Sequence, residues 1–339
     1  MIGLEEIRSN FFEGAENIAA LDIDVWQTPF DVIHEEGPFR LIHYHNGEKR
    51  YKTPILQVYA YINRPYILDL QPDISVVRCL LEHGFDVYMI DWGYPKRIHR
   101  FIDIEDYVDY IDFCIEIVKS RVGVDKLTLH GYCLGGTLSL IYTALNPQPI
   151  KNLLVQATPV DFDNNATMTL WAKSIDVDKI ADTLGCAPGD FLNLGFLSVD
   201  PIRLIIGKYT NLVEHIVEEK FLKNFLRMER WIYDSPAIPG ATYKRYIKEW
   251  YQENKVIKGE FTIYDQKVDL AKIDMPTLVL AANRDHIVPP ESTTPLLDKI
   301  SSTDKQLMTV DRGHIGLSVS SIAHKELWPK VCQWLEQHS

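Results

Sequence analysis

The chain contains little cysteine: five residues among 339, an odd number with neither paired nor metal-type spacing. This pattern does not predict a disulfide framework. The histidines are scattered, and no HExxH motif or paired Cys/His spacing occurs, so we expect no metal centre. The one glycine cluster, at Gly131, Gly135 and Gly136, lacks a P-loop lysine and dinucleotide spacing. A nucleotide cofactor is therefore not expected.

Long apolar runs are also missing, and no secretory segment is visible, so we expect a soluble, cytoplasmic protein without a transmembrane anchor. The net charge is −12 and no basic block occurs, which argues against nucleic-acid binding. There are no internal repeats or low-complexity tracts. Hydrophobic residues make up 46% of the chain, enough for a sizeable core.

From Thr53 onward, short apolar segments alternate with amphipathic ones. This alternation predicts a mostly parallel, doubly wound α/β sheet with its site at the carboxyl ends of the strands. Apart from the strand within residues 127–137, which is described below, strands are predicted at 54–60, 85–90, 151–157, 261–264, 276–282 and 305–310. Helices are predicted at 73–83, at 104–121, from the 127–137 segment up to residue 145, and at 327–335. A further amphipathic helix is predicted at 4–18.

The sequence LTLHGYCLGGT at 127–137 is the most informative segment. An apolar strand leads into a Gly-x-Cys-x-Gly turn and an apolar helix follows, which is the pattern of the nucleophile elbow of α/β-hydrolases with Cys133 as the nucleophile. The helix N-terminus at this position favours a thiolate and an oxyanion. The alternative for Cys133, taken alone, is an ordinary core cysteine at a strand-to-helix turn.

Two later loops supply partners for this cysteine. Asp285 follows the predicted strand at 276–282, and His314, between Gly313 and Gly316, follows the strand at 305–310. Nucleophile, acid and histidine thus occur in the order typical of the fold. His286 is the competing base, although it lies on the loop that normally supplies the acid.

The α/β alternation breaks between residues 161 and 260, where the sequence is helical and rich in aromatic residues. We expect this segment to be a lid inserted into an α/β-hydrolase core of residues 51–160 and 261–339. Residues 1–50 are expected to form a helical or extended N-terminal region.

With these features, the chain resembles the polyhydroxyalkanoate synthases, specifically the short catalytic subunits of the two-component enzymes. The resemblance extends from about Thr53 to the end and rests on several blocks besides the elbow. These blocks are YILDLQP at 66–72, VYMIDWGYP at 87–95, TPVDF at 158–162, DHIVP at 285–289 and GHIG at 313–316.

The resemblance implies a Cys133–His314–Asp285 triad, with His286 and Asp161 beside it. The substrate would be a 3-hydroxyacyl-CoA, above all 3-hydroxybutyryl-CoA, with CoA as the leaving group and no separate cofactor. Backbone N–H groups of Leu134 and of the loop after Val58, at Ile62 or Asn63, would hold the oxyanion.

The same resemblance implies a second, non-catalytic subunit, a homodimer and association with polyester granules. Two alternatives stay open. A cysteine hydrolase of the dienelactone type has a similar elbow, but is shorter and lacks a long lid. A catalytically silent granule-associated subunit would have no need for the three triad residues.

Overall fold

The computed structural model describes residues 23–45 and 47–339. The helix predicted at 4–18 lies outside these residues. None of the helices in the described part of the chain combines the length and apolar character needed to cross a bilayer.

The described residues form one eight-stranded sheet in the order β1-β2-β4-β3-β5-β6-β11-β12. The β1–β2 and β2–β4 pairs are antiparallel, and all other neighbours are parallel. The predicted mostly parallel α/β sheet is therefore confirmed. The strands are β1 (Phe30–Glu36), β2 (Phe39–Tyr44), β3 (Ile55–Val58), β4 (Val87–Asp91), β5 (Leu127–Tyr132), β6 (Ile150–Gln156), β11 (Thr277–Ala282) and β12 (Lys305–Val310).

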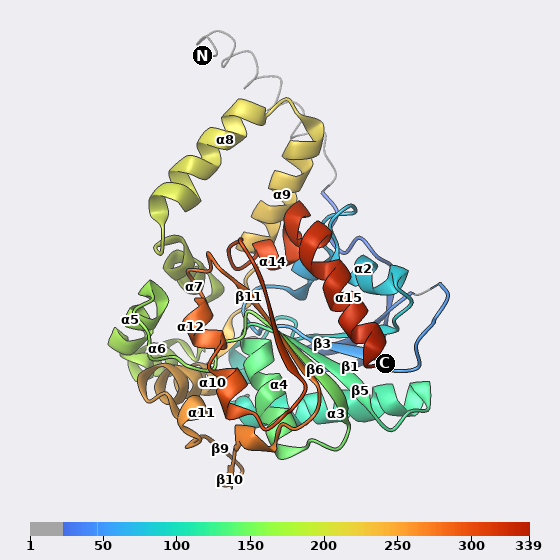
Figure 1. Cartoon of the computed structure of the whole chain (residues 1–339). Coiled ribbons are helices and arrows are strands. Elements are labelled where there is room, and N and C mark those ends of the chain that lie inside the picture. The colour runs from blue at the N-terminus through green and yellow to red at the C-terminus, as the bar shows by residue number, and fades with distance from the viewer. Residues whose placement is uncertain (1–22, 46) are drawn as a thin grey trace.

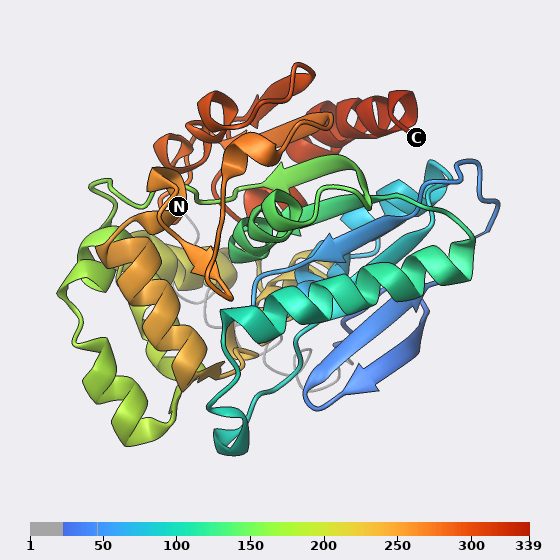
Figure 2. The same cartoon turned by 90° about the horizontal axis from the view of Figure 1, so that it is seen from below.

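Helices cover both faces of the sheet. In Figure 1, α3 (Ile104–Val122) and α4 (Leu134–Leu145) lie below the strands, and α2 (Val76–Glu82) and α15 (Trp328–Gln337) lie above them. Figure 2, seen from below, shows α3 in turquoise in front of the strands. Every residue of β3, β4, β5 and β11 is buried, as expected for parallel strands covered on both sides.

The sheet differs from the prediction at two places. It begins earlier, because β1 and β2 form a hairpin at one edge of the sheet. The strand predicted at 261–264 as part of the main sheet is wrong: β9 (Thr262–Ile263) pairs only with β10 (Gln266–Lys267). Tyr264 and Asp265 have φ angles of 48° and 61°, and this left-handed backbone reverses the chain after two residues.

The segment between β6 and β11 is mainly helical and gathers at one end of the sheet, with α8 and α9 projecting at the top of Figure 1. Besides β9 and β10, it contains the short strands β7 (Cys186–Ala187) and β8 (Ile238–Pro239), which pair with each other. Its helices are α5 (Thr167–Ser174), α6 (Val177–Leu184), α7 (Gly189–Leu197), η3 (Ile202–Gly207), α8 (Lys208–His215), α9 (Glu219–Tyr233), α10 (Gly240–Arg245), η4 (Tyr246–Gln252) and α11 (Lys255–Lys258).

Short helices complete the connections of the core. They are η1 (Pro65–Asp69), η2 (Arg97–His99), η5 (Leu270–Lys272), α12 (Pro290–Thr293), α13 (Leu296–Lys299), α14 (Gly316–Val319) and η6 (Ala323–Leu327).

Candidate active site

Cys133 lies between the end of β5 and the start of α4, with φ 53° and ψ −126°. A positive φ is costly for a residue with a side chain, and such strain persists only where the surroundings enforce it. Here the Cys133 N–H donates to the carbonyl of Gln156 at the end of β6, at 2.9 Å. The turn therefore holds the thiol at the carboxyl end of the central strands.

At three positions of the elbow, neighbouring atoms leave no room for a side chain, so only glycine fits. A Cβ atom on Gly131 would lie 2.4 Å from Cα of Gly136, and one on Gly136 would lie 1.9 Å from Oγ1 of Thr158. A Cβ on Gly135 would lie 2.2 Å from the carbonyl oxygen of Val58. The first turn of α4 therefore packs directly on β5 and on the loop that follows β3.

His314 and Asp285 form a close pair on the neighbouring loops. Nδ1 of His314 lies 2.6 Å from Oδ2 of Asp285. The other carboxylate oxygen accepts the backbone N–H groups of Ile287 and Val288, at 2.9 and 2.8 Å. Both side chains are buried. His314 and Cys133 line the same cavity, and Cys133 contributes to the electrostatic surroundings of His314.

The protonation of His314 follows from these neighbours. Burial by itself lowers its pKa, but the charges of Asp285 and Cys133 outweigh burial and raise the pKa to about 10. The protonated imidazole is thus favoured at neutral pH. A histidine beside a cysteine is the usual acceptor of the thiol proton in nucleophilic catalysis.

Cys133 and His314 open onto a cavity of about 380 Å³. Its wall is almost entirely apolar and comes from both the core and the segment between β6 and β11. Among the residues that line it are Ile62, Leu134, Met168, Leu192, Phe196, Met228, Trp231, Ile247, Tyr251, Ile287 and Val319. The site is therefore a hydrophobic enclosure with Cys133 and His314 at its edge.

Comparisons with known proteins agree with this geometry. Residues 64–320 match the family model of the alpha/beta hydrolase fold, and residues 12–80 match that of the poly-beta-hydroxybutyrate polymerase (PhaC) N-terminus. A poly(3-hydroxyalkanoate) polymerase subunit PhaC of Synechocystis sp. is 41% identical over 356 residues, covering 99% of this chain and 94% of the relative. The chain belongs to the PhaC family.

Two further relatives differ in how much of their own length the match covers. The PhaC subunit of Haloferax mediterranei is 43% identical over 323 residues, and the match covers 94% of this chain and 66% of that relative. The PhaC subunit of Allochromatium vinosum is 40% identical, with 96% and 93% covered.

Solved structures show the fold alone. A soluble variant of monoglyceride lipase from Saccharomyces cerevisiae superposes with a TM-score of 0.59 at 15% identity, covering 94% of this chain and 98% of that one. A metagenome-derived lipolytic enzyme gives a TM-score of 0.55 at 12% identity, with 88% and 97% covered.

In this member of the PhaC family, the loop after β3 lies against the elbow. Ile62, Asn63 and Leu134 all line the cavity. Asn63 has a φ of 61°, and its side-chain amide donates to Oγ of Ser235 at 2.6 Å. The Trp231 indole donates to the carbonyl of Arg64 at 2.8 Å. These bonds hold the end of α9 on the loop that faces Cys133.

His286 and Asp161 lie elsewhere. His286 is exposed to solvent, and neither residue is among those that line the cavity. Oδ1 of Asp161 accepts the side-chain amide of Asn254 at 2.8 Å and the N–H of Asp163 at 2.9 Å. Asp161 thus joins two segments of the chain, and the structure does not bring it to Cys133.

Sequence reasoning missed the tyrosines of the cavity. Tyr59, Tyr132, Tyr246 and Tyr251 line it, and Tyr59 and Tyr132 stack with ring centroids 5.0 Å apart. Burial raises the pKa of the Tyr59, Tyr132 and Tyr246 hydroxyls well above the usual value, so these groups stay neutral. Tyr132 directly precedes Cys133 in the sequence, and this adjacency was the one signal that could have predicted its position in the cavity wall.

Proposed function

We propose that this chain is the catalytic subunit of a polyhydroxyalkanoate synthase. It polymerises 3-hydroxyacyl-CoA, above all 3-hydroxybutyryl-CoA, into polyester and releases CoA. Family membership supports the activity, because the relatives are named poly(3-hydroxyalkanoate) polymerase subunits. The observation that carries the residue assignment is that His314, paired with Asp285, lines the same apolar cavity as Cys133.

In the first half-reaction, His314 accepts the Cys133 proton and the thiolate attacks the thioester carbonyl of the substrate. The resulting oxyanion is held by the backbone N–H of Leu134, at the first turn of α4, and by an N–H of the loop after β3. The tetrahedral intermediate collapses and breaks the bond to the CoA sulfur. His314 returns its proton to that sulfur, and the acyl group remains on Cys133 as a new thioester.

In the second half-reaction, the 3-hydroxyl of another unit attacks the acyl-Cys133 thioester. The imidazole of His314, oriented by Asp285, takes the hydroxyl proton, and the Cys133 thiolate leaves as the ester forms. Cysteine suits this cycle because exchanging one thioester for another is nearly balanced, so the enzyme-bound acyl group stays reactive. The apolar wall of the cavity disfavours water as a competing nucleophile.

The reaction proposed here uses no cofactor beyond the CoA of the substrate. We also propose a second, non-catalytic subunit, because relatives with which this chain shares nearly its full length are named as subunits. A homodimer, cytoplasmic location and attachment to granules through the growing polyester belong to the same proposal.

The test is release of free thiol from 3-hydroxybutyryl-CoA, with insoluble polyester assayed in the same samples. Cys133→Ala is the variant, and Cys186→Ala is the control because its buried thiol lies outside the cavity. We expect thiol release and polymer from the chain and from Cys186→Ala, and neither from Cys133→Ala. Thiol release that persists in Cys133→Ala would overturn the assignment.

The partner subunit decides one further outcome. Thiol release that yields only free hydroxy acid, both with and without a second subunit, would identify a hydrolase. Polymer that appears only when the second subunit is added would support the two-component enzyme.

A further inference from the structure

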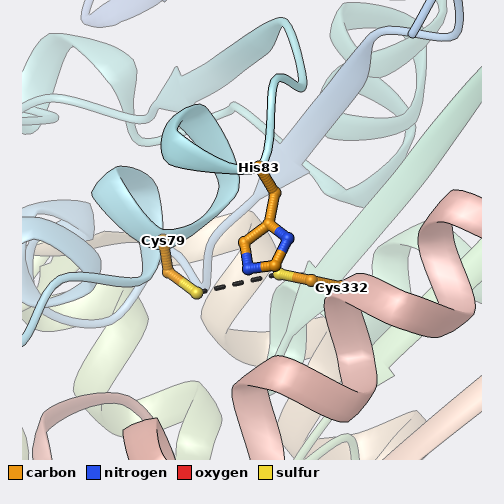
Figure 3. Close-up of side chains that lie close together, drawn as sticks. All are labelled: Cys79, His83 and Cys332. Carbon is orange, nitrogen blue, oxygen red and sulfur yellow. Dashed lines mark hydrogen bonds between the residues drawn. The ribbon is translucent and has the colours of Figure 1, made fainter. Parts of the chain in front are cut away.

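A second cluster of reactive side chains lies away from the cavity, where α2 meets α15. Figure 3 shows Cys79 and His83 from α2 and its C-terminal cap, together with Cys332 from α15, with their side chains pointing toward one another. One potential ligand atom from each residue lies within 4.8 Å of the others. None of the three lines the cavity that contains Cys133.

The two sulfur atoms have the separation of metal ligands. Their Sγ atoms lie 3.7 Å apart. Two thiolates on one tetrahedral Zn²⁺, each bound at about 2.3 Å, stand about 3.8 Å apart. A disulfide would need a separation of about 2.0 Å. Cys79 and His83 are four residues apart and so project from the same side of their helix.

His83 is oriented as a metal-binding histidine. Its Nδ1 atom lies 3.0 Å from Oε1 of Glu336, which leaves Nε2 on the side of the ring that faces the sulfurs. A carboxylate on the outer nitrogen of a ligating histidine fixes the tautomer and strengthens the ligand.

The cluster also has an entry path. Cys332 is fully buried and Cys79 is half-buried, whereas 37% of the His83 side chain is exposed. An ion can therefore arrive from solvent on the histidine side and reach both sulfurs.

We propose that Cys79, His83 and Cys332 bind one thiophilic divalent cation, Zn²⁺, with Glu336 positioning His83 and water as the fourth ligand. Binding releases the two thiol protons to solvent and involves no redox change. The ion ties the C-terminal helix α15 to α2 across one face of the sheet. Its role is structural, and it takes no part in the chemistry at Cys133.

Sequence reasoning predicted no metal here. The first two ligands have helical i, i+4 spacing without a second close pair, and the third lies near the far end of the chain. Only the packing of α15 on α2 brings them together.

The experiment uses Co²⁺ as a spectroscopic probe and the full chain carrying Cys133→Ala, so that the catalytic thiol cannot bind metal. The protein is reduced, stripped with chelator and titrated without oxygen. We expect one equivalent of Co²⁺ with thiolate-to-metal charge-transfer absorption, displaced by Zn²⁺, and a higher thermal midpoint with Zn²⁺. Cys186→Ser, added to this background, is the matched control and should bind as before.

Three variants define the outcome. Cys79→Ser should abolish the charge-transfer absorption and the Zn²⁺-dependent rise of the midpoint, and His83→Gln should weaken both. Glu336→Gln should lower the Co²⁺ affinity by about 10- to 100-fold. Absence of the absorption in the parent chain, or its persistence in Cys79→Ser, would overturn the site. The site would also be overturned if Cys79 and Cys332 lose their free thiols on air oxidation and the reduced protein then binds no metal.

Discussion

The imidazole of His314 is held by Asp285 through a 2.6 Å contact between Nδ1 and Oδ2. The carboxylate is itself fixed, because its other oxygen accepts two backbone N–H groups of the loop that follows it. The orientation of His314 therefore depends on the conformation of two loops, one after β11 and one after β12.

Replacing Asp285 with Asn tests this relationship. The amide keeps the shape of the side chain but removes its charge and favours the wrong tautomer of His314. We expect kcat/KM for thiol release from 3-hydroxybutyryl-CoA to fall by roughly 10⁴-fold, as when the acid of a Ser-His-Asp triad is changed to Asn. A loss of less than tenfold in a variant with an unchanged circular dichroism spectrum would remove Asp285 from the triad.

The raised pKa of His314 predicts a pH dependence of stability. Because its folded-state pKa of about 10 lies above the usual 6.5, the protonated imidazole stabilises the folded state. This contribution is fully present below pH 6.5 and is lost as the pH rises toward 10. The difference in unfolding free energy between the chain and His314→Gln, measured in urea, should shrink over that range. His286→Gln, at an exposed position, is the control, and a difference for His314→Gln that is independent of pH would contradict the prediction.

Gly135→Ala should damage the elbow without touching the triad side chains. The added methyl group would lie 2.2 Å from the carbonyl oxygen of Val58, so α4 must shift away from the loop after β3. We expect a loss of about 1–3 kcal/mol in unfolding free energy together with reduced kcat. Gly47→Ala, where the new Cβ meets no atom within 4 Å, should leave both unchanged. Equal stabilities of the two variants would show that the helix can move freely.

Asp234 anchors the end of α9 to the core, and its removal should loosen the cover of the cavity. One oxygen accepts the Tyr66 hydroxyl at 2.8 Å, and the other accepts the Tyr94 hydroxyl at 2.6 Å. Asp234→Ala should cost about 1–3 kcal/mol because the buried Tyr66 hydroxyl loses its partner.

Amide hydrogen exchange in α9 should accelerate in that variant, while the strands of the sheet stay protected. Asp190→Ala, at an exposed position of α7, is the comparison. Unchanged exchange in α9 would mean that other contacts hold the helix.

The sequence predicted most of the sheet because its strands are short, apolar and followed by amphipathic helices. It did not predict that β1 and β2 belong to the sheet. The burial of β1 is only partial, and its pattern alone does not distinguish an edge strand from a loop. The strand expected at 261–264 was wrong because two left-handed residues, Tyr264 and Asp265, turn the chain after Ile263.

The positions of Cys133, Asp285 and His314 followed from the strand ends that carry them, since loops at the carboxyl edge of a parallel sheet converge. A row of buried polar side chains beneath them was not foreseen. His130 lies between Gln57 and Gln156, at 3.1 and 3.2 Å, and Gln156 continues to Ser318 at 2.9 Å. Burial lowers the pKa of His130 to about 4 and keeps it neutral. Such a row depends on strand order, which periodicity does not contain.

The order of Cys133 after β5, Asp285 after β11 and His314 after β12 has a consequence for the newly made protein. Translation delivers the nucleophile first, then the helices between β6 and β11, then Asp285 and finally His314. At about 5–20 residues per second, roughly ten to forty seconds separate the emergence of Cys133 from that of His314. If the proposed roles hold, a nascent chain carries Cys133 without its base until His314 has left the ribosome.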